Sequence, residues 1–153
     1  FLPQLIQSAE TVQQAFEKLK AALSAVDGGS ISKGKLVLAT VHHDVHDIGK
    51  NIVKVILQNY GFDVIDLGKD VPPEAILEAC EQHDIKVVGL SALMTSTVTS
   101  MEKTIALIRK ERPETVFIVG GAVLNPEYAQ MIQADHYAKD ARETAQIVQQ
   151  LFR

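Results

Sequence analysis

Three of the five histidines of the chain, His42, His43 and His46, lie within five residues of one another, and Asp44 stands two residues before His46. A carboxylate at that spacing can accept the N–H of one ring nitrogen, which fixes the tautomer and makes the other nitrogen a better ligand. Gly49 follows and allows a close approach of backbone or ligand. We therefore expect His46 to be a metal-binding or catalytic histidine, the alternative being a solvated loop residue.

The pattern does not predict a metal site built from protein ligands alone. Zinc takes three or four ligands, and no second cluster of histidine and cysteine has suitable spacing. His42 and His43 are neighbours whose side chains we expect to point apart, as residues of a strand end that meets solvent. A single histidine is better suited to the axial position of a metal that a macrocycle already holds.

The elements that would position these residues are apolar runs that alternate with helical patterns. The runs predict strands at 36–41, 62–67, 87–90, 116–119 and 136–138, and helices at 48–60, 73–83, 97–112, 126–132 and 141–152. Unbroken apolar strands are typical of a parallel sheet buried on both faces. We expect a doubly wound, flavodoxin-like α/β fold with strand order 2-1-3-4-5, which binds ligands beyond the carboxyl ends of its strands.

Two further polar or small segments reach the same predicted edge of the sheet. The segment Ser91–Thr97 follows the third strand, and Gly120-Gly121-Ala122 follows the fourth. The hydroxyls of Ser96 or Thr97 could cap the next helix, or could bind a planar heterocycle. The glycines could form a turn or leave room for a ligand. No phosphate-binding glycine motif occurs.

The first part of the chain has a different pattern. Apolar residues spaced by three and four predict a helix over 4–26, and the glycines and serines that follow are typical of a linker. We expect residues 1–27 to be the C-terminal helix of a truncated helical unit, 28–34 a linker, and 35–153 the α/β domain.

Composition narrows the class of protein. The net charge is −4 and the 15 basic residues are scattered, so the sequence lacks the basic footprint of a nucleic-acid-binding protein. No apolar run is long enough to span a membrane and no signal peptide opens the chain, so we expect no membrane partner and a cytoplasmic location. The single cysteine, Cys80, is expected to be a buried structural thiol.

Three motifs in order carry a resemblance to a known family: Asp44-x-His46-x-x-Gly49, Ser91-x-Leu93 and Gly120-Gly121. Together they resemble the cobalamin-binding module that cobalamin-dependent methionine synthase, the corrinoid proteins of methanogens and acetogens, and some mutases share. The resemblance covers nearly the whole chain. It implies that cobalamin binds base-off, with its nucleotide tail buried beside the sheet.

The resemblance also implies roles for individual residues. His46 would be the lower axial ligand of cobalt, Asp44 would hold its other ring nitrogen, and Thr97 would complete the triad where the methionine synthase pattern has a serine. Leu2 would belong to the helical cap over the upper face of the corrin. The implied cofactor-binding residues are Asp44, Val45, His46, Asp47, Ile48, Gly49, Ser91, Leu93, Thr95, Thr97, Gly120, Gly121, Ala122 and Leu2.

The function implied first is that of the cobalamin module of methionine synthase. The cofactor would alternate between cob(I)alamin and methylcobalamin, carrying methyl from methyltetrahydrofolate to homocysteine. Folate, homocysteine and reactivation modules, and the zinc of one of them, would be separate from this chain, which would not be catalytic alone.

The alternative is a stand-alone corrinoid shuttle protein that serves separate methyltransferase subunits of a methanol, methylamine or O-demethylase system. A cobalamin-sensing regulator is less favoured because nothing helix-turn-helix-like is present. A receiver-type signalling domain would need acidic residues clustered at the end of the first strand and a lysine after the fifth, and Asp44 with His46 fits that requirement poorly.

Overall fold

The computed structural model describes residues 11–15, 17–18 and 32–153 of the chain. Residues 11–15 and 17–18 are helical, inside the helix that the sequence predicts for the first segment. Leu2 and most of the predicted linker lie outside the described residues. The division into a cap helix, a linker and an α/β domain therefore stays a prediction.

The α/β domain alternates strands and helices from residue 35 to residue 151. Its elements are β1 (Lys35–Thr40), α2 (Ile48–Asn59), β2 (Asp63–Asp66), α3 (Pro73–His83), β3 (Val87–Ser91), α4 (Thr95–Glu111), β4 (Val116–Gly120), α5 (Pro126–Met131), β5 (His136–Tyr137) and α6 (Ala141–Leu151). The predicted bounds agree within two residues. The largest difference is α4, which begins two residues early and so takes Thr95 and Ser96 into the helix.

The five strands form one parallel sheet in the order β2-β1-β3-β4-β5. This confirms the predicted flavodoxin-like arrangement. The central strand β3 aligns Ser91 with Thr40 of β1 on one side and with Gly120 of β4 on the other. The carboxyl ends of three strands therefore meet at one edge, where the polar segments of the sequence begin.

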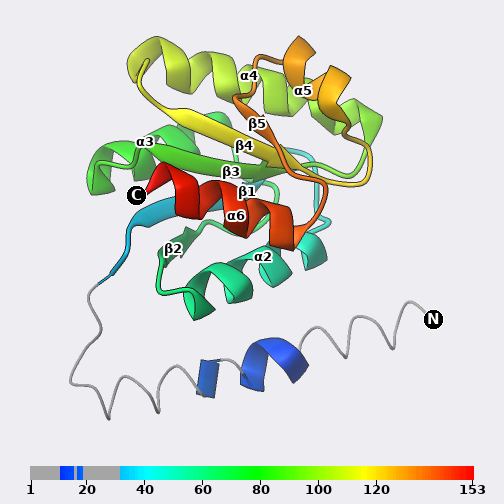
Figure 1. Ribbon diagram of the computed structural model, residues 1–153. Helices are drawn as coiled ribbons and strands as arrows, with labels where there is room; N and C mark the ends of the chain where they lie inside the picture. The colour runs from blue at the N-terminus through cyan, green and yellow to red at the C-terminus, as the bar shows by residue number, and fades with distance from the viewer. Residues whose placement is uncertain (1–10, 16, 19–31) are drawn as a thin grey trace.

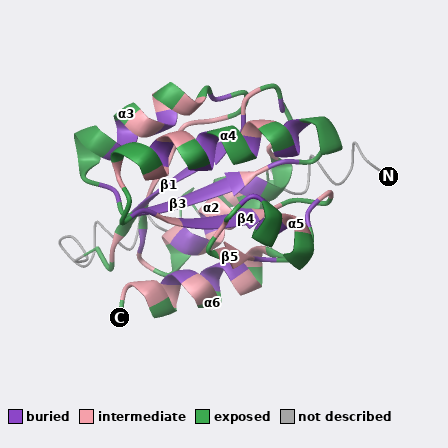
Figure 2. Ribbon diagram, turned by 90° about the horizontal axis from the view of Figure 1, so that it is seen from above, coloured by how far each residue is buried: buried purple, intermediate pink, exposed green. Residues whose placement is uncertain are grey.

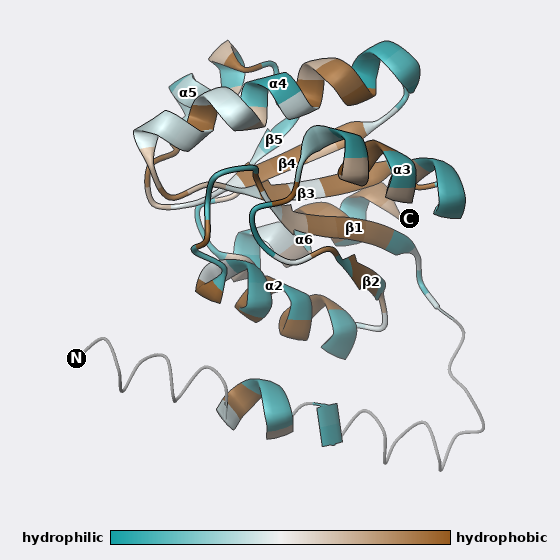
Figure 3. Cartoon of the chain, turned by 180° about the vertical axis from the view of Figure 1, so that it is seen from behind, coloured by the Kyte–Doolittle hydropathy of each residue, from teal (hydrophilic) through white to brown (hydrophobic). Residues whose placement is uncertain are grey.

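Helices cover both faces of the sheet (Figure 1). Helices α3, α4 and α5 pack on one face, and α2 and α6 pack on the other. Strands β1, β3 and β4 are the most buried elements (Figure 2), because both of their faces are covered. The hydropathy colouring shows the same layers, with apolar strands between helices whose outer faces are polar (Figure 3). Within the described residues, no helix is both long enough and apolar enough to cross a bilayer.

Cys80 lies on the inner side of α3, and none of it is exposed. Burial raises the pKa of its thiol from 9.0 to about 11. Since the thiolate is the reactive form, we expect no reaction with Ellman's reagent at about pH 8 in native buffer. One thiol per chain should react in denaturant, because the sequence holds one cysteine. Rapid labelling of the native protein would contradict this packing.

Candidate functional site

The loop that carries His46 connects β1 to α2 at the carboxyl edge of the sheet. It leaves β1 at Thr40 and reaches the first residue of α2 at Ile48. The Thr40 hydroxyl donates to the carbonyl oxygen of His46 at 3.4 Å. The backbone of His46 is therefore anchored to the last residue of β1, which also limits the movement of the imidazole.

Asp44 is the centre of this loop and is completely buried. Its Oδ1 accepts the backbone N–H of His46 at 3.0 Å and lies 2.8 Å from His46 Nδ1. Its Oδ2 accepts the backbone N–H of Leu93 and the hydroxyl of Thr97, each at 2.7 Å. One carboxylate thus joins the loop after β1 to the segment after β3.

The pKa of Asp44 is lowered from 3.8 to about 2. Burial opposes ionisation, but the hydrogen bonds from the Leu93 N–H, the Thr97 hydroxyl and His46 outweigh it. Asp44 is therefore ionised at neutral pH. An ionised carboxylate can only accept, so the hydrogen on the 2.8 Å contact belongs to His46 Nδ1.

This tautomer leaves the other ring nitrogen of neutral His46, Nε2, with a free lone pair. Among the described residues Nε2 has no hydrogen-bond partner, and 46% of the side chain is exposed. A neutral imidazole held through Nδ1 by a carboxylate is the usual arrangement of a histidine that ligates a metal. The loop thus presents Nε2 of His46 to solvent as one oriented nitrogen that can ligate a metal.

Thr97 is the third member of the predicted triad, and the structure brings it into contact with Asp44. It is buried, and its hydroxyl donates to Asp44 Oδ2, lies 2.8 Å from the carbonyl oxygen of Met94 and accepts the Met94 N–H at 3.3 Å. Helix α4 begins at Thr95 with Met94 as its N-cap residue, so Ser96 does not cap it, while Thr97 at the third helical position accepts the Met94 N–H in a capping box. The hydroxyl of Thr97 therefore serves both the start of the helix and the carboxylate of Asp44.

Small and hydroxyl-bearing residues form a row across the sheet on the face covered by α2 and α6. The row is set by the register of Thr40 with Ser91 and of Ser91 with Gly120. The hydroxyls of Thr40 and Ser91 are hydrogen-bonded at 2.8 Å. Such a row of low side-chain volume is consistent with the predicted slot for a planar group.

Two of the three glycines expected to provide space, Gly121 and Gly49, differ in their surroundings. A Cβ at Gly121 would lie 1.8 Å from the backbone oxygen of Ala92, and its φ is +134°. The close approach of the segments after β3 and β4 therefore requires glycine at 121 before any ligand is considered. A Cβ at Gly49 would meet nothing within 4 Å, so the fold itself leaves open space there.

Apolar side chains are exposed on the segments next to His46. They lie on the loop, at the start of α2 and after β3, and they are Val45 (57% exposed), Ile48 (39%), Ile52 (40%), Leu93 (41%) and Met94 (37%). Asp47 is the N-cap residue of α2, while Thr95 and Ala122 are exposed at the same edge. Exposed apolar area beside one oriented ligand nitrogen fits a large, partly apolar group better than a hydrated ion.

An ion pair between the start of α2 and the end of β2 was not foreseen from the sequence. Lys50, in the first turn of α2, is 4% exposed and pairs with Asp66 at the end of β2, which also lies 3.7 Å from Lys54. Burial of the carboxyl raises the pKa of Asp66, whereas the hydrogen bonds from Lys50 and the Gly68 N–H lower it. The net result is a pKa below the usual value of 3.8. An aspartate in a strand of a covered sheet was the available signal, because such a carboxylate needs a cation nearby.

The expectation that His42 and His43 point apart is wrong. Their rings are stacked, with centroids 3.8 Å apart and planes inclined by 18°. The cause is the backbone of His43, whose φ of +70° turns the chain so that successive side chains fall on the same side. Both lie beside Asp70, from the loop after β2.

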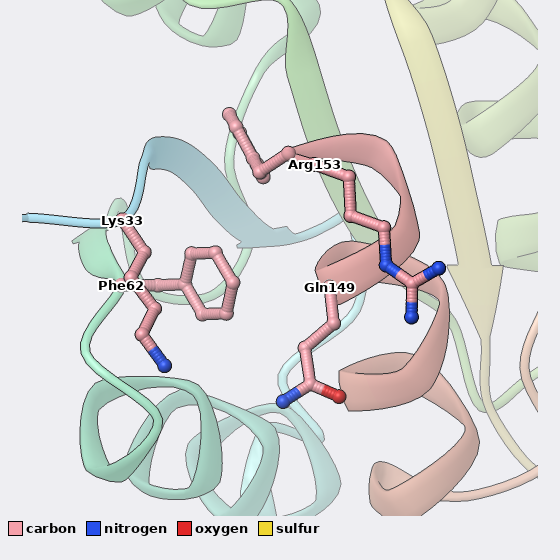
Figure 4. Close-up of a pocket in the computed structure, with 5 residues that line it drawn as sticks. Lys33, Phe62, Gln149 and Arg153 are labelled. Carbon is pink, nitrogen blue, oxygen red and sulfur yellow. The ribbon is translucent and has the colours of Figure 1, made fainter.

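A separate hollow of about 480 Å³ lies at the opposite end of the domain (Figure 4). It is lined by Lys33, Phe62, Gln149, Phe152 and Arg153. Lys33 and Phe62 precede β1 and β2, so this hollow lies at the amino ends of the strands and shares no residue with the His46 loop.

Comparison with known proteins gives a consistent family. The sequence profile described as "B12 binding domain" matches residues 34–148. Dimethylamine corrinoid protein 3 of Methanosarcina acetivorans is 39% identical over 145 residues, which are 94% of this chain and 67% of that protein. Methionine synthase of Mycobacterium leprae is 37% identical over 93% of this chain, but over only 13% of its own length.

Solved structures show the same relationship. A cobalamin-binding protein from Desulfitobacterium hafniense has a TM-score of 0.76 and 36% identity, covering 98% of this chain and 70% of that one. The methanol:cobalamin methyltransferase complex of Methanosarcina barkeri gives a TM-score of 0.77 and 31% identity, covering 99% of this chain and 58% of that one. A receiver domain from Mycobacterium tuberculosis, at a TM-score of 0.59 and 19% identity, shares the fold alone.

Proposed function

The chain belongs to the family of B12-binding domains, and on that premise we propose that it is a corrinoid carrier that serves a separate methyltransferase. The observation that carries the proposal is the Asp44–His46 pair, which leaves one ligand nitrogen free on a loop that also exposes apolar side chains. One histidine cannot hold a metal ion by itself, but it suffices for a metal that a corrin ring holds.

The residues of the chain fit such a group. His46 Nε2 would supply a nitrogen ligand to the cobalt, and Asp44 would fix the tautomer through Nδ1. Thr97 and the Leu93 N–H hold the carboxylate in its ionised form. The row of Thr40, Ser91 and Gly120 would border the slot for the nucleotide tail. When bound, the corrinoid supplies the cobalt on which a methyl group is carried.

The carrier function is better supported than the methionine synthase function expected first. The dimethylamine corrinoid protein matches over two thirds of its length, whereas the methionine synthase match is a small part of a much longer protein. A similar solved structure, from Methanosarcina barkeri, is a methanol:cobalamin methyltransferase complex, which supports a methyltransferase partner. By analogy, the partner proposed here is a methyltransferase subunit that acts on methanol or a methylamine. The methionine synthase module remains the second candidate because 93% of the chain matches it.

The test uses the chain loaded with cobalamin. It is presented to a dimethylamine-dependent corrinoid methyltransferase and, separately, to a methionine synthase fragment that holds the folate and homocysteine sites. The carrier function predicts methyl transfer to the bound corrinoid only in the first mixture. Transfer only in the second would favour the methionine synthase module. Failure to retain cobalamin during gel filtration would contradict both.

A glycine substitution tests whether open space at α2 serves the ligand. Replacing Gly49 with alanine should leave the apoprotein as stable or up to about 1 kcal/mol more stable, because nothing lies near the added Cβ and alanine favours the helix. If the space admits the corrinoid, cobalamin affinity should fall about tenfold or more, as measured by spectral titration. Gly121→Ala is the contrasting variant, since it should destabilise the apoprotein itself. Unchanged affinity in Gly49→Ala would remove Gly49 from the site.

A further inference from the structure

A second cluster of metal-capable side chains lies beside the His46 loop but does not include His46. It consists of His42 and His43, at the exit of β1, and Asp70, in the loop after β2. One ligand atom from each residue lies within 4.8 Å of the other two. His42 Nε2 is 3.7 Å from Asp70 Oδ1, and the two imidazole rings are stacked.

The backbone holds this cluster in position. Asp70 donates its N–H to the carbonyl oxygen of Asp44 at 2.8 Å, and its Oδ1 accepts the N–H of His43 at 2.7 Å. Both His43 and Asp70 are in the left-handed region, with φ of +70° and +53°. Histidine and aspartate adopt this region more readily than most residues, and here it brings the two side chains to the same side of the loops.

The side chains of the cluster are open to solvent. The side chains of His42 and Asp70 are 37% and 53% exposed, and His43 is exposed as well. Asp70 Oδ2 has no hydrogen-bond partner within the described part of the chain. Two imidazoles and a carboxylate oxygen are therefore accessible to an ion from solvent.

We propose that His42, His43 and Asp70 form a binding site for a divalent ion of the Zn²⁺ class. Two imidazole nitrogens and one carboxylate oxygen are a usual set of three protein ligands for zinc, with water in the fourth position. Ligand atoms about 2.0–2.1 Å from zinc lie roughly 3.3 Å from one another in a tetrahedral site. The exposed side chains therefore have to bring their ligand atoms closer by at most about 1.5 Å from the separation of up to 4.8 Å that the structure shows.

The site is distinct from the one proposed for the corrinoid. His46 directs Nδ1 at buried Asp44, whereas the cluster uses the neighbouring residues of the loop and a residue from another strand connection. The two sites share one backbone contact, from the Asp70 N–H to the Asp44 oxygen. An ion bound at the cluster would therefore tie the loop after β2 to the loop that presents His46.

The experiment is calorimetric titration of tag-free protein with Zn²⁺, repeated with Co²⁺ while its visible d–d bands are recorded. The wild type should bind one ion per chain. Two conservative variants should weaken binding at least about tenfold. His43→Gly suits the positive φ, and Asp70→Asn keeps both the left-handed backbone and an acceptor for the His43 N–H. Circular dichroism and thermal unfolding in the absence of metal verify that both variants fold.

Two control variants separate this site from other histidines. His46→Ala and His83→Ala should bind Zn²⁺ as the wild type does. Loss of binding in His46→Ala with retention in His43→Gly would place the ion at His46 and overturn the proposal. Absence of wild-type binding at micromolar protein would overturn it as well. Cobalamin retention is measured separately, so failure here leaves the corrinoid proposal unaffected.

Discussion

Replacing Asp44 with alanine is expected to destabilise the protein more than any other substitution in the loop. The change leaves two backbone N–H groups and the Thr97 hydroxyl without the acceptor that they share in the folded state. A polar group that loses its partner where water cannot reach it costs about 1–3 kcal/mol, and these donors surround a completely buried carboxylate, so we expect a loss of about 3 kcal/mol in the free energy of unfolding. Urea unfolding of the apoprotein, followed by circular dichroism, measures it.

The matched control is Asp47→Ala, three residues along the same loop. Asp47 is the N-cap residue of α2 but makes no capping hydrogen bond with its side chain, so its removal should cost about 1 kcal/mol or less. Equal losses in the two variants would contradict the central place of Asp44.

The same variant has a pH dependence whose sign follows from the lowered pKa. A carboxyl with a folded-state pKa of about 2 and an ordinary value of 3.8 stabilises the folded state above pH 4 or so, and this contribution is lost as the pH falls toward about 2. The difference in unfolding free energy between wild type and Asp44→Ala should therefore shrink over that range. A difference independent of pH would mean that the ionised form is not the stabilising one.

Replacing His46 with alanine is expected to have its large effect on the cofactor rather than on the fold. Asp44 keeps its bonds from Leu93, Thr97 and the backbone N–H of residue 46, so the loss of stability should be about 1 kcal/mol. Bound cobalamin should lose the protein nitrogen and show the spectrum of the water-ligated form. Affinity should fall about tenfold or more, because a ligand to the metal is removed.

The control for this variant is His43→Gly, which changes another histidine of the same loop at a position where glycine suits the backbone. It should leave the cobalamin spectrum unchanged. Together the two variants give opposite patterns, since His43→Gly should lose Zn²⁺ and keep cobalt ligation whereas His46→Ala should do the reverse. An unchanged spectrum in His46→Ala would remove His46 from the cobalt.

The sequence by itself determined the fold and the order of its elements. Helix α3 was predicted with its observed bounds because Pro73 suits the first turn of a helix and the apolar spacing ends at His83. The parallel sheet followed from unbroken apolar runs separated by helices, since only a sheet covered on both faces buries such strands. The order of the strands is the flavodoxin-like one expected for such a sheet, and the structure confirms it. The three motifs identified the family because each follows its own strand, and the profile that matches residues 34–148 confirms it.

Only the tertiary structure decided which atoms meet at the edge of the sheet. The contact of Asp44 with the Leu93 N–H joins residues 49 positions apart, and the pairing of Lys50 with Asp66 joins α2 to β2. Periodicity reports which side of one element is buried, but not the register that brings two elements together. The stacking of His42 on His43 was missed for a related reason, since a positive φ at a histidine leaves no mark in the sequence.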